Sequence, residues 1–151
     1  MASATSTLYE MAPFRFATSA NGIAQITANN DTFRIMLLTS ADAFVNEHSV
    51  MAQISGKEIS HQNYPAGGIA LAGVTFNVAS SGTATLDASD VIVTASGSDL
   101  SAQSLAVFAS RTSAERSPLI CHVDFGGTQT AGAGTNFTIT WSADGIVQVR
   151  G

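Results

Sequence analysis

Side chains that commonly bind zinc occur close together at one place in the sequence. His122 and Asp124 lie two residues apart, so in an extended strand both point to the same face. With His48 or His61 from elsewhere they could chelate zinc. Because only two of these ligands are local, a polar face that meets solvent or a partner is favoured over a metal site.

Three aspartates, Asp87, Asp90 and Asp99, are close enough in sequence to suggest a calcium loop. However, the Asp-x-Asp-x-Asn/Asp-Gly order of such loops is absent. Asp87 is better explained as the start of a turn, and Asp90 as the entry to a strand. We therefore predict no metal and no cofactor.

The pair Cys121-His122 has the residue types of a nucleophile and its base. Neighbours on a strand point to opposite faces, so these two side chains cannot bond to each other there. Cys121 falls in an apolar row, which predicts a core position. There is no Gly-x-Ser-x-Gly motif, and no phosphate-binding lysine or helix follows the glycines of 126–134. The sequence thus favours a protein that is not an enzyme.

A polar segment contains Arg111, Glu115 and Arg116, which could form ion pairs between subunits, because the arginine fork fits a carboxylate at an interface. A solvated loop explains the same residues equally well. An aromatic residue in a glycine-rich loop and three residues near the N-terminus are also predicted to lie at an interface. The full set of predicted interface residues is Phe14, Arg15, Phe16, Tyr64, Arg111, Glu115 and Arg116.

The elements that would position these residues are short strands. Apolar and polar residues alternate, or apolar residues run together, in segments separated by turn residues every 8 to 12 positions. This pattern predicts an all-β fold, an antiparallel β-sandwich or jelly-roll-like barrel of about seven or eight strands. The clearest candidates are 32–39, 69–78, 83–86, 90–95, 100–110, 119–125, 135–141 and 146–149.

The chain divides into an N-terminal arm, 1–16, and one β-rich domain, 17–151. A brief helix is expected over 41–50 with Ser40 as its cap, and a long flexible loop over 126–134. The large side chains assigned to the core are Leu119, Val123, Phe125, Phe137, Ile139 and Trp141.

Composition excludes several functions. Only 11% of residues are charged, the net charge is −5, and six Lys+Arg are too few for a nucleic-acid binder. No uncharged apolar stretch of ~18 residues exists, so we expect no contact with a membrane. The chain is 45% apolar, which argues against disorder. A surface of small, uncharged residues suits a subunit that is buried in an assembly.

Five segments, taken in order, resemble a family of small virion proteins of tailed bacteriophages. The family pattern has Tyr-x-x-Gly-Gly-x-x-Leu-x-Gly, then Phe/Leu-Asp-Ala-x-Asp-Val, Ser-Pro-Leu-Ile-x-x-x-Asp-Phe-Gly and a closing Phe-Thr-Ile-x-Trp. This chain departs from it at Ile92-Val93, where members often carry Trp. The matching segments, within residues 58–149, are Tyr64–Thr75, Thr85–Val91, Ser117–Gly126, Gly134–Trp141 and Asp144–Val149.

The resemblance implies a structural part of the virion, assembled in the host cytoplasm. Within that family we expect a capsid cement or decoration protein, a homotrimer whose partner is the major capsid protein. Its contacts would lie in 2–16, 64–68, 111–116 and 126–134. Two alternatives stay open, a tail, neck or fibre-base component and a host-surface carbohydrate-binding module. The second would use Tyr64 as its exposed aromatic.

Overall fold

The computed structural model describes residues 5–9, 26, 31–78 and 83–150. In this part of the chain all pairing between strands is antiparallel, so the predicted all-β antiparallel fold is confirmed. The strands number ten in the described residues rather than seven or eight, and they do not close into a barrel. They are β1 Thr5–Leu8, β2 Thr32–Leu38, β3 Ile69–Ala70, β4 Thr75–Val78, β5 Thr83–Asp87, β6 Val91–Thr94, β7 Leu100–Ser110, β8 Leu119–Ala131, β9 Asn136–Ile139 and β10 Val147–Arg150.

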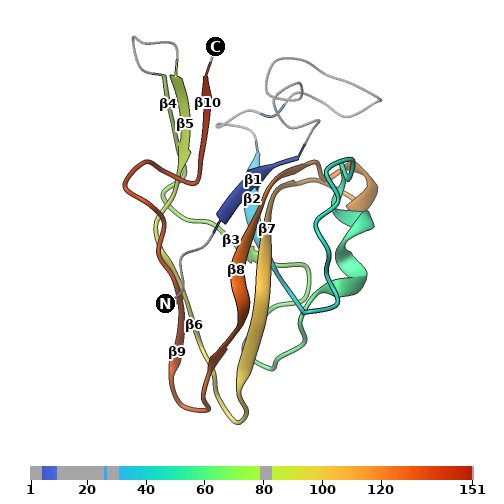
Figure 1. Ribbon diagram of the computed structural model, residues 1–151, viewed down its shortest axis with the longest axis vertical. Coiled ribbons are helices and arrows are strands. Elements are labelled where there is room, and N and C mark those ends of the chain that lie inside the picture. Colours follow the sequence, from blue (N-terminus) through green and yellow to red (C-terminus); the bar gives the residue numbers. More distant parts are fainter. Residues whose placement is uncertain (1–4, 10–25, 27–30, 79–82, 151) are drawn as a thin grey trace.

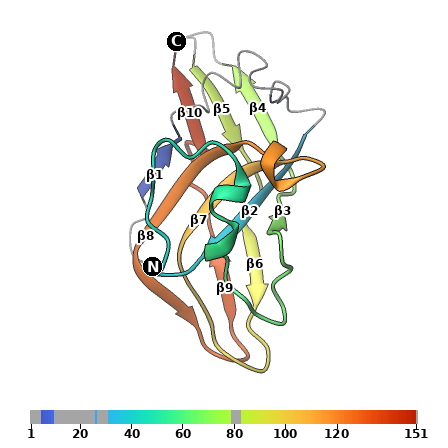
Figure 2. The same ribbon diagram turned by 90° about the vertical axis from the view of Figure 1, so that its right-hand side faces the viewer.

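A five-stranded sheet in the order β1-β8-β7-β2-β3 forms the centre of the molecule. The two-stranded sheet of β6 and β9 lies against one face of this central sheet. The three-stranded sheet β10-β5-β4 lies at the end of the molecule away from β6 and β9 (Figure 1). The other face is covered by the first part of the segment 39–68, which contains the short 3-10 turns η1 (Met51–Gln53) and η2 (Ser55–Lys57) (Figure 2). Ile59 and Tyr64, near the end of this segment, join the cluster on the β6–β9 side. A third turn, η3 (Ala114–Arg116), precedes β8.

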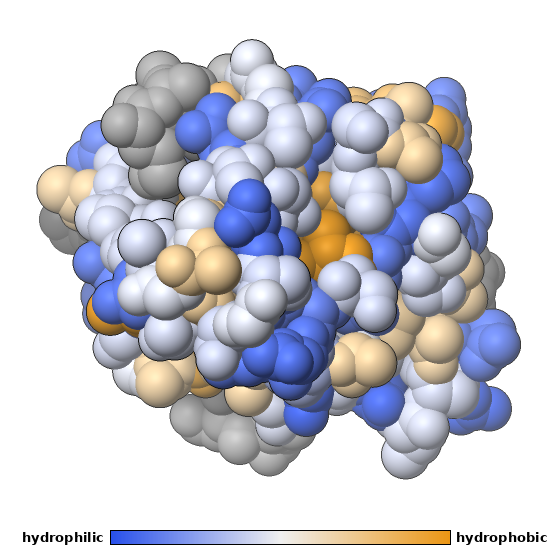
Figure 3. Space-filling model, turned by 90° about the horizontal axis from the view of Figure 1, so that it is seen from below, coloured by the Kyte–Doolittle hydropathy of each residue, from blue (hydrophilic) through white to orange (hydrophobic). Residues whose placement is uncertain are grey.

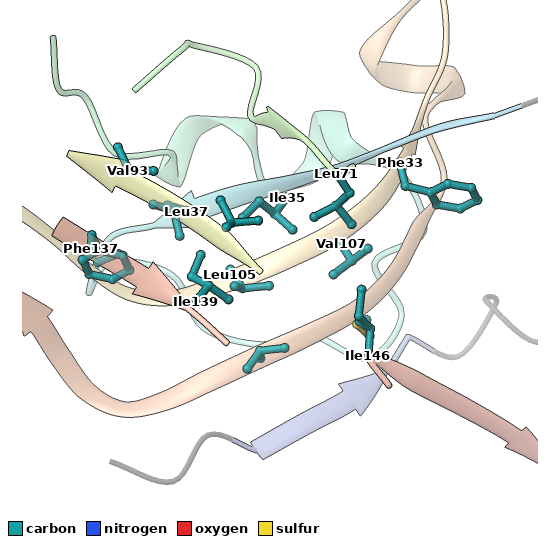
Figure 4. Packing of buried hydrophobic residues seen from close by; sticks show 14 of the residues in the cluster. Phe33, Ile35, Leu37, Leu71, Val93, Leu105, Val107, Phe137, Ile139 and Ile146 are labelled. Carbon is teal, nitrogen blue, oxygen red and sulfur yellow. The ribbon is translucent and has the colours of Figure 1, made fainter. Parts of the chain in front are cut away.

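The central strand β7 is buried on both faces, as the sequence predicted. Leu105 and Val107 face the β6–β9 side, where they join a cluster that includes Ile139 (Figure 4). Ala106 and Phe108 alternate with them and pack under the 39–68 segment. A strand with two apolar faces needs cover on both, and this need organises the layers around it.

The predicted core is largely confirmed. Five of the six residues assigned to it are buried. Trp141 is only partly buried: it packs against the cluster while its indole Nε1 donates to the Ser89 carbonyl at 3.2 Å. An indole N–H normally needs such a partner, so the ring lies at the edge of the core.

The flexible loop predicted over 126–134 is wrong for most of its length, because β8 continues to Ala131. Gly126 has φ +77°, a left-handed conformation that suits glycine, and the register with β7 shifts between Ala102 and Ser104. The glycine pair therefore forms a bulge inside a long strand, not the start of a loop.

A second register shift lies between Val107 and Phe108. Ile120 is the extra residue of this bulge, since Cys121 pairs with Val107 and Leu119 with Phe108. Leu119 consequently joins the cluster under the 39–68 segment, whereas Cys121 joins the cluster on the opposite face.

The helix predicted over 41–50 is also wrong. This segment contains turns, irregular backbone and an isolated β-bridge from Val50 to Pro118, and the 3-10 turns η1 and η2 follow it. Its end is tied to the start of β8 by backbone hydrogen bonds, from Leu119 N to Ser49 O and from Met51 N to Ser117 O. These bonds hold the backbone extended at Val50, so a helix cannot continue through it.

Part of the predicted N-terminal arm belongs to the sheet. Thr5–Leu8 form β1, which pairs with β8 from Thr5↔Asp124 to Leu8↔Cys121. The next residue, Tyr9, is 1% exposed and packs with the 39–68 segment. Residues 10–16 of that arm lie outside the described residues.

The glycine pair Gly67-Gly68 provides a matched test of the packing beneath β3. Both residues have positive φ, +87° and +88°, but only at Gly68 would a Cβ overlap the Ile35 carbonyl oxygen. We expect Gly67→Ala to cost about 1–2 kcal/mol from backbone strain alone, and Gly68→Ala at least about 3 kcal/mol. Urea unfolding of both variants measures the difference. Equal losses would contradict this packing.

Candidate functional site

A buried polar cluster joins the 39–68 segment to the central sheet. His122 Nε2 on β8 lies 2.8 Å from Asp42 Oδ2, and the Ser104 hydroxyl on β7 donates to the same oxygen at 3.2 Å. The His122 and Asp42 side chains are 7% and 4% exposed. His122 was predicted on a polar face that meets solvent or a partner, but in this chain it is buried by Asp42 and its loop.

The surroundings of the cluster set its charge. Burial alone would raise the pKa of Asp42, but the hydrogen bond and charge of His122, together with the Ser104 bond, hold that pKa below its usual value. Burial also raises the pKa of the nearby Tyr9 phenol, and the negative charge of Asp42 adds to the effect. Asp42 is therefore a carboxylate at neutral pH, while Tyr9 is a neutral phenol.

Aromatic rings enclose this cluster. Phe44 lies 5.2 Å from the ring of Tyr9 and 5.2 Å from that of His122, measured between centroids. The rings pack the 39–68 segment against β8 and the residue that follows β1. They add to the burial of the Asp42 and His122 side chains.

The residue types Ser, His and Asp also occur in hydrolases, but their geometry differs here. In a serine hydrolase the imidazole accepts the proton of the serine hydroxyl. Here the Ser104 hydroxyl donates to Asp42, and His122 Nε2 contacts the same carboxylate oxygen. Ser104 is thus not activated as a nucleophile, and the arrangement ties a loop to the sheet.

A depression of about 410 Å³ opens beside the cluster, where β8 bulges at Gly126. Its lining comes from the polar cluster, from the two strands next to the bulge, and from β1. The residues are Thr7, Asp42, Ala43, Phe44, Gln103, Ser104, His122 and Asp124. Asp124 is exposed and accepts a hydrogen bond from Gly126 N at 2.8 Å, so it also stabilises the bulge.

The residues considered as metal ligands do not assemble into a site. Among the described residues, no three His, Cys, Asp or Glu side chains come together as a metal site would require. His61, considered as a ligand with His122, instead lies 3.1 Å from the Ser98 carbonyl through Nε2.

The three aspartates considered for calcium each accept a backbone N–H. Asp87 accepts from Ala88 at 2.8 Å, Asp90 from Trp141 at 3.0 Å, and Asp99 from Ala133 at 2.9 Å. Each of these carboxylates therefore fixes a loop between strands.

The structure corrects the prediction that Tyr64 is an interface residue. Its side chain is 5% exposed, its hydroxyl donates to Glu58 Oε1 at 2.8 Å, and it accepts from Leu37 N at 3.0 Å. Glu58 also accepts from Gly67 N. Tyr64 holds its glycine-rich loop against β2, so it offers no aromatic surface to a carbohydrate.

Arg111, another predicted interface residue, has a partner within the chain. Its Nε lies 2.6 Å from Asp31 Oδ1, and its Nη2 donates to Asp31 Oδ2 at 2.9 Å. This two-point contact ties the end of β7 to the residue before β2. Glu115 and Arg116 are exposed in η3, whereas Phe14, Arg15 and Phe16 lie outside the described residues.

Asp42 and Ser104 were not predicted as site residues from the sequence. Asp42 is 80 positions from His122 and 62 from Ser104, so no local spacing relates them. Two signals were available: a serine inside the apolar run of β7, and a histidine on an otherwise apolar strand. Buried polar residues of this kind normally have partners, but the identity of the partner needs the fold.

No protein-family model, curated protein or solved structure matches this chain in the comparisons. In the described part of the chain, no helix has the length and apolar character needed to span a membrane.

The contribution of Asp42 to stability can be measured by its amide variant. Asp42→Asn removes the charge that His122 and Ser104 bind, and we expect a loss of roughly 1.5–3 kcal/mol at pH 7. Because the folded state lowers the pKa of Asp42, the wild-type advantage is full above about pH 4 and disappears as pH falls through the folded-state value. Urea titrations from pH 3 to pH 7 test this. Asp144→Asn, which changes an exposed aspartate, is the control. If Asp42→Asn lost the same amount of stability at every pH, the proposed role of the Asp42 charge would be contradicted.

The two arginines of the 111–116 segment should behave differently. Arg111→Ala leaves Asp31, whose side chain is 3% exposed, without this partner, and should cost roughly 1–3 kcal/mol of stability. Arg116→Ala removes an exposed side chain and should change stability by less than about 0.5 kcal/mol. Thermal unfolding of both variants decides between the two roles. An unchanged unfolding midpoint for Arg111→Ala would show that its contact with Asp31 does not stabilise the fold.

Proposed function

We propose that this chain is a structural protein of a tailed-phage particle, a capsid cement protein that binds the outside of the shell and stabilises it. Its partners would be the major capsid protein and its own copies in a homotrimer. It would join the virion in the host cytoplasm. The observation that carries the proposal is the ordered set of segments within residues 58–149 that resembles this class of virion proteins.

Several residues of those segments fix loops between strands in this fold. Tyr64 holds the loop before β3, Asp90 accepts from the backbone of Trp141, and the Ser117 hydroxyl accepts from Arg111 N at 2.9 Å. A pattern of this kind preserves a rigid β-module and leaves its outer surface free to vary. That is the requirement for a protein whose function lies in surface contacts rather than in a reaction.

The surface composition supports the same proposal. Figure 3 shows an end of the molecule where pale residues of intermediate hydropathy separate scattered hydrophilic ones. On the outer side of β6, Ile92 is 62% exposed opposite Thr138 on β9. A charge-poor surface of this kind loses little solvation when it is covered by a neighbouring subunit.

Binding to empty shells tests the proposal directly. Purified protein added to expanded capsids that lack decoration should bind and raise their disruption temperature, because a ligand of the assembled state stabilises it by mass action. Calorimetry with increasing protein measures the shift. An unchanged temperature at saturating protein would exclude the cement function.

The copy number in purified virions distinguishes a location of this protein on the shell from a location in the tail or neck. Quantitative mass spectrometry against the major capsid protein should give a ratio near one to one or one to two. A few copies per hundred capsid subunits would place the protein in the tail or neck, and absence from the particle would overturn the virion assignment.

A further inference from the structure

The depression beside the Asp42–His122 pair has the features of a contact site for a charged side chain. It lies at a bulge on the outer side of the central sheet, and its lining residues come from β1, β7, β8 and the 39–68 segment. Three of them, Asp42, Ser104 and His122, are held in place by the hydrogen bonds described above. The walls are therefore fixed before any partner arrives.

The charge of this depression is negative. Asp42 is paired with His122, but Asp124 forms no ion pair within the described residues. The hydrogen bond from Gly126 N reaches only Oδ1 of Asp124, so Oδ2 is available to a ligand. The carboxylate of Asp124 is thus the group in this depression that can attract a cation, and the chain as a whole carries a net charge of −5.

One wall of the depression is aromatic, and an aromatic wall favours the guanidinium group of arginine over the ammonium group of lysine. The Phe44 ring packs on Tyr9 and His122 and lines the same space as Asp124. A guanidinium group can stack on an aromatic ring and donate two parallel hydrogen bonds to a carboxylate. The compact ammonium of lysine cannot do both equally well.

We propose that this depression binds an arginine side chain of the shell protein, with Asp124 as its carboxylate partner and Phe44 as its stacking surface. The assignment of the occupant to the shell rests on the proposed function. Charge complementarity favours a basic partner, because this chain has a net charge of −5 and only six Lys+Arg of its own. Two of them, Arg34 and Arg111, already have partners inside the chain.

The chemistry of the pocket can be tested without any capsid. N-acetyl-arginine methylamide should shift the backbone amide signals of Gly126 and His122 in nuclear magnetic resonance spectra, with an affinity on the order of millimolar for one such contact. The citrulline analogue has nearly the same shape but no charge, and should give no saturable shift. Asp124→Asn should abolish the response to arginine. Equal shifts with both probes, or a response kept by Asp124→Asn, would overturn the proposal.

Capsid binding then tests the occupant. Asp124→Asn should weaken binding to undecorated capsids by about tenfold, whereas the matched control Asp144→Asn should bind as the wild type does. If the wild type binds and Asp124→Asn binds equally well, the arginine contact is wrong although the cement function holds. If the wild type does not bind, the cement function and the shell occupant both fail, and the titration alone decides the pocket chemistry.

The mass of the protein in solution tests whether a second copy of this chain occupies the depression instead. Light scattering should give the same oligomeric state for wild type and Asp124→Asn in the absence of capsids. A change in mass would show that the depression is filled by a second copy of this chain, whose Arg116 is exposed, and would overturn the assignment to the shell protein.

Discussion

The burial of β7 on both faces is the constraint on which the rest of this structure depends. Eleven residues long, the strand lies between β8 and β2 and carries apolar side chains on each side. One face is covered by the sheet of β6 and β9, whose side chains alternate regularly. The other is covered by 39–68, a segment with little regular structure. Its backbone bonds lie mostly in turns within the segment, so side-chain bonds add to the few backbone bonds that tie it to the sheet.

The tethers of that segment explain why polar groups are buried in a domain of low charge. Asp42 binds His122 and Ser104 near its beginning, and Tyr64 binds Glu58 and Leu37 near its end. Burying a carboxylate costs free energy unless it is hydrogen-bonded and paired, and Asp42 meets both conditions. The gain lies in placing Phe44 and Ile54 over the sheet, where they close the second apolar cluster.

The strands could be predicted from the sequence, because alternation is a local property. The bounds of β7 were predicted correctly, and Phe137 and Ile139 face inward as expected. What the sequence could not provide is register and long-range pairing. The glycine pair at 126–127 was predicted to begin a loop but forms a bulge within β8, because two glycines are compatible with a loop and with a bulge. The contact of Asp42 with His122 spans 80 positions, and the burial of Tyr64 depends on Glu58 across a turn. The contact of Arg111 with Asp31 could not be predicted for the same reason, because these two residues are distant in sequence.

The bulge in β8 links the stability of this domain to the site proposed on its surface. Asp124 pairs with Ser104 directly before the bulge, and it lines the depression together with Gln103. The same carboxylate that offers an oxygen to a partner also binds Gly126 N and so stabilises the backbone that presents it. A side chain fixed in this way loses little freedom when it binds, and so less of the binding free energy is spent on ordering it. A rigid β-module can therefore make a specific contact through a single carboxylate, even where most of its surface is small and uncharged.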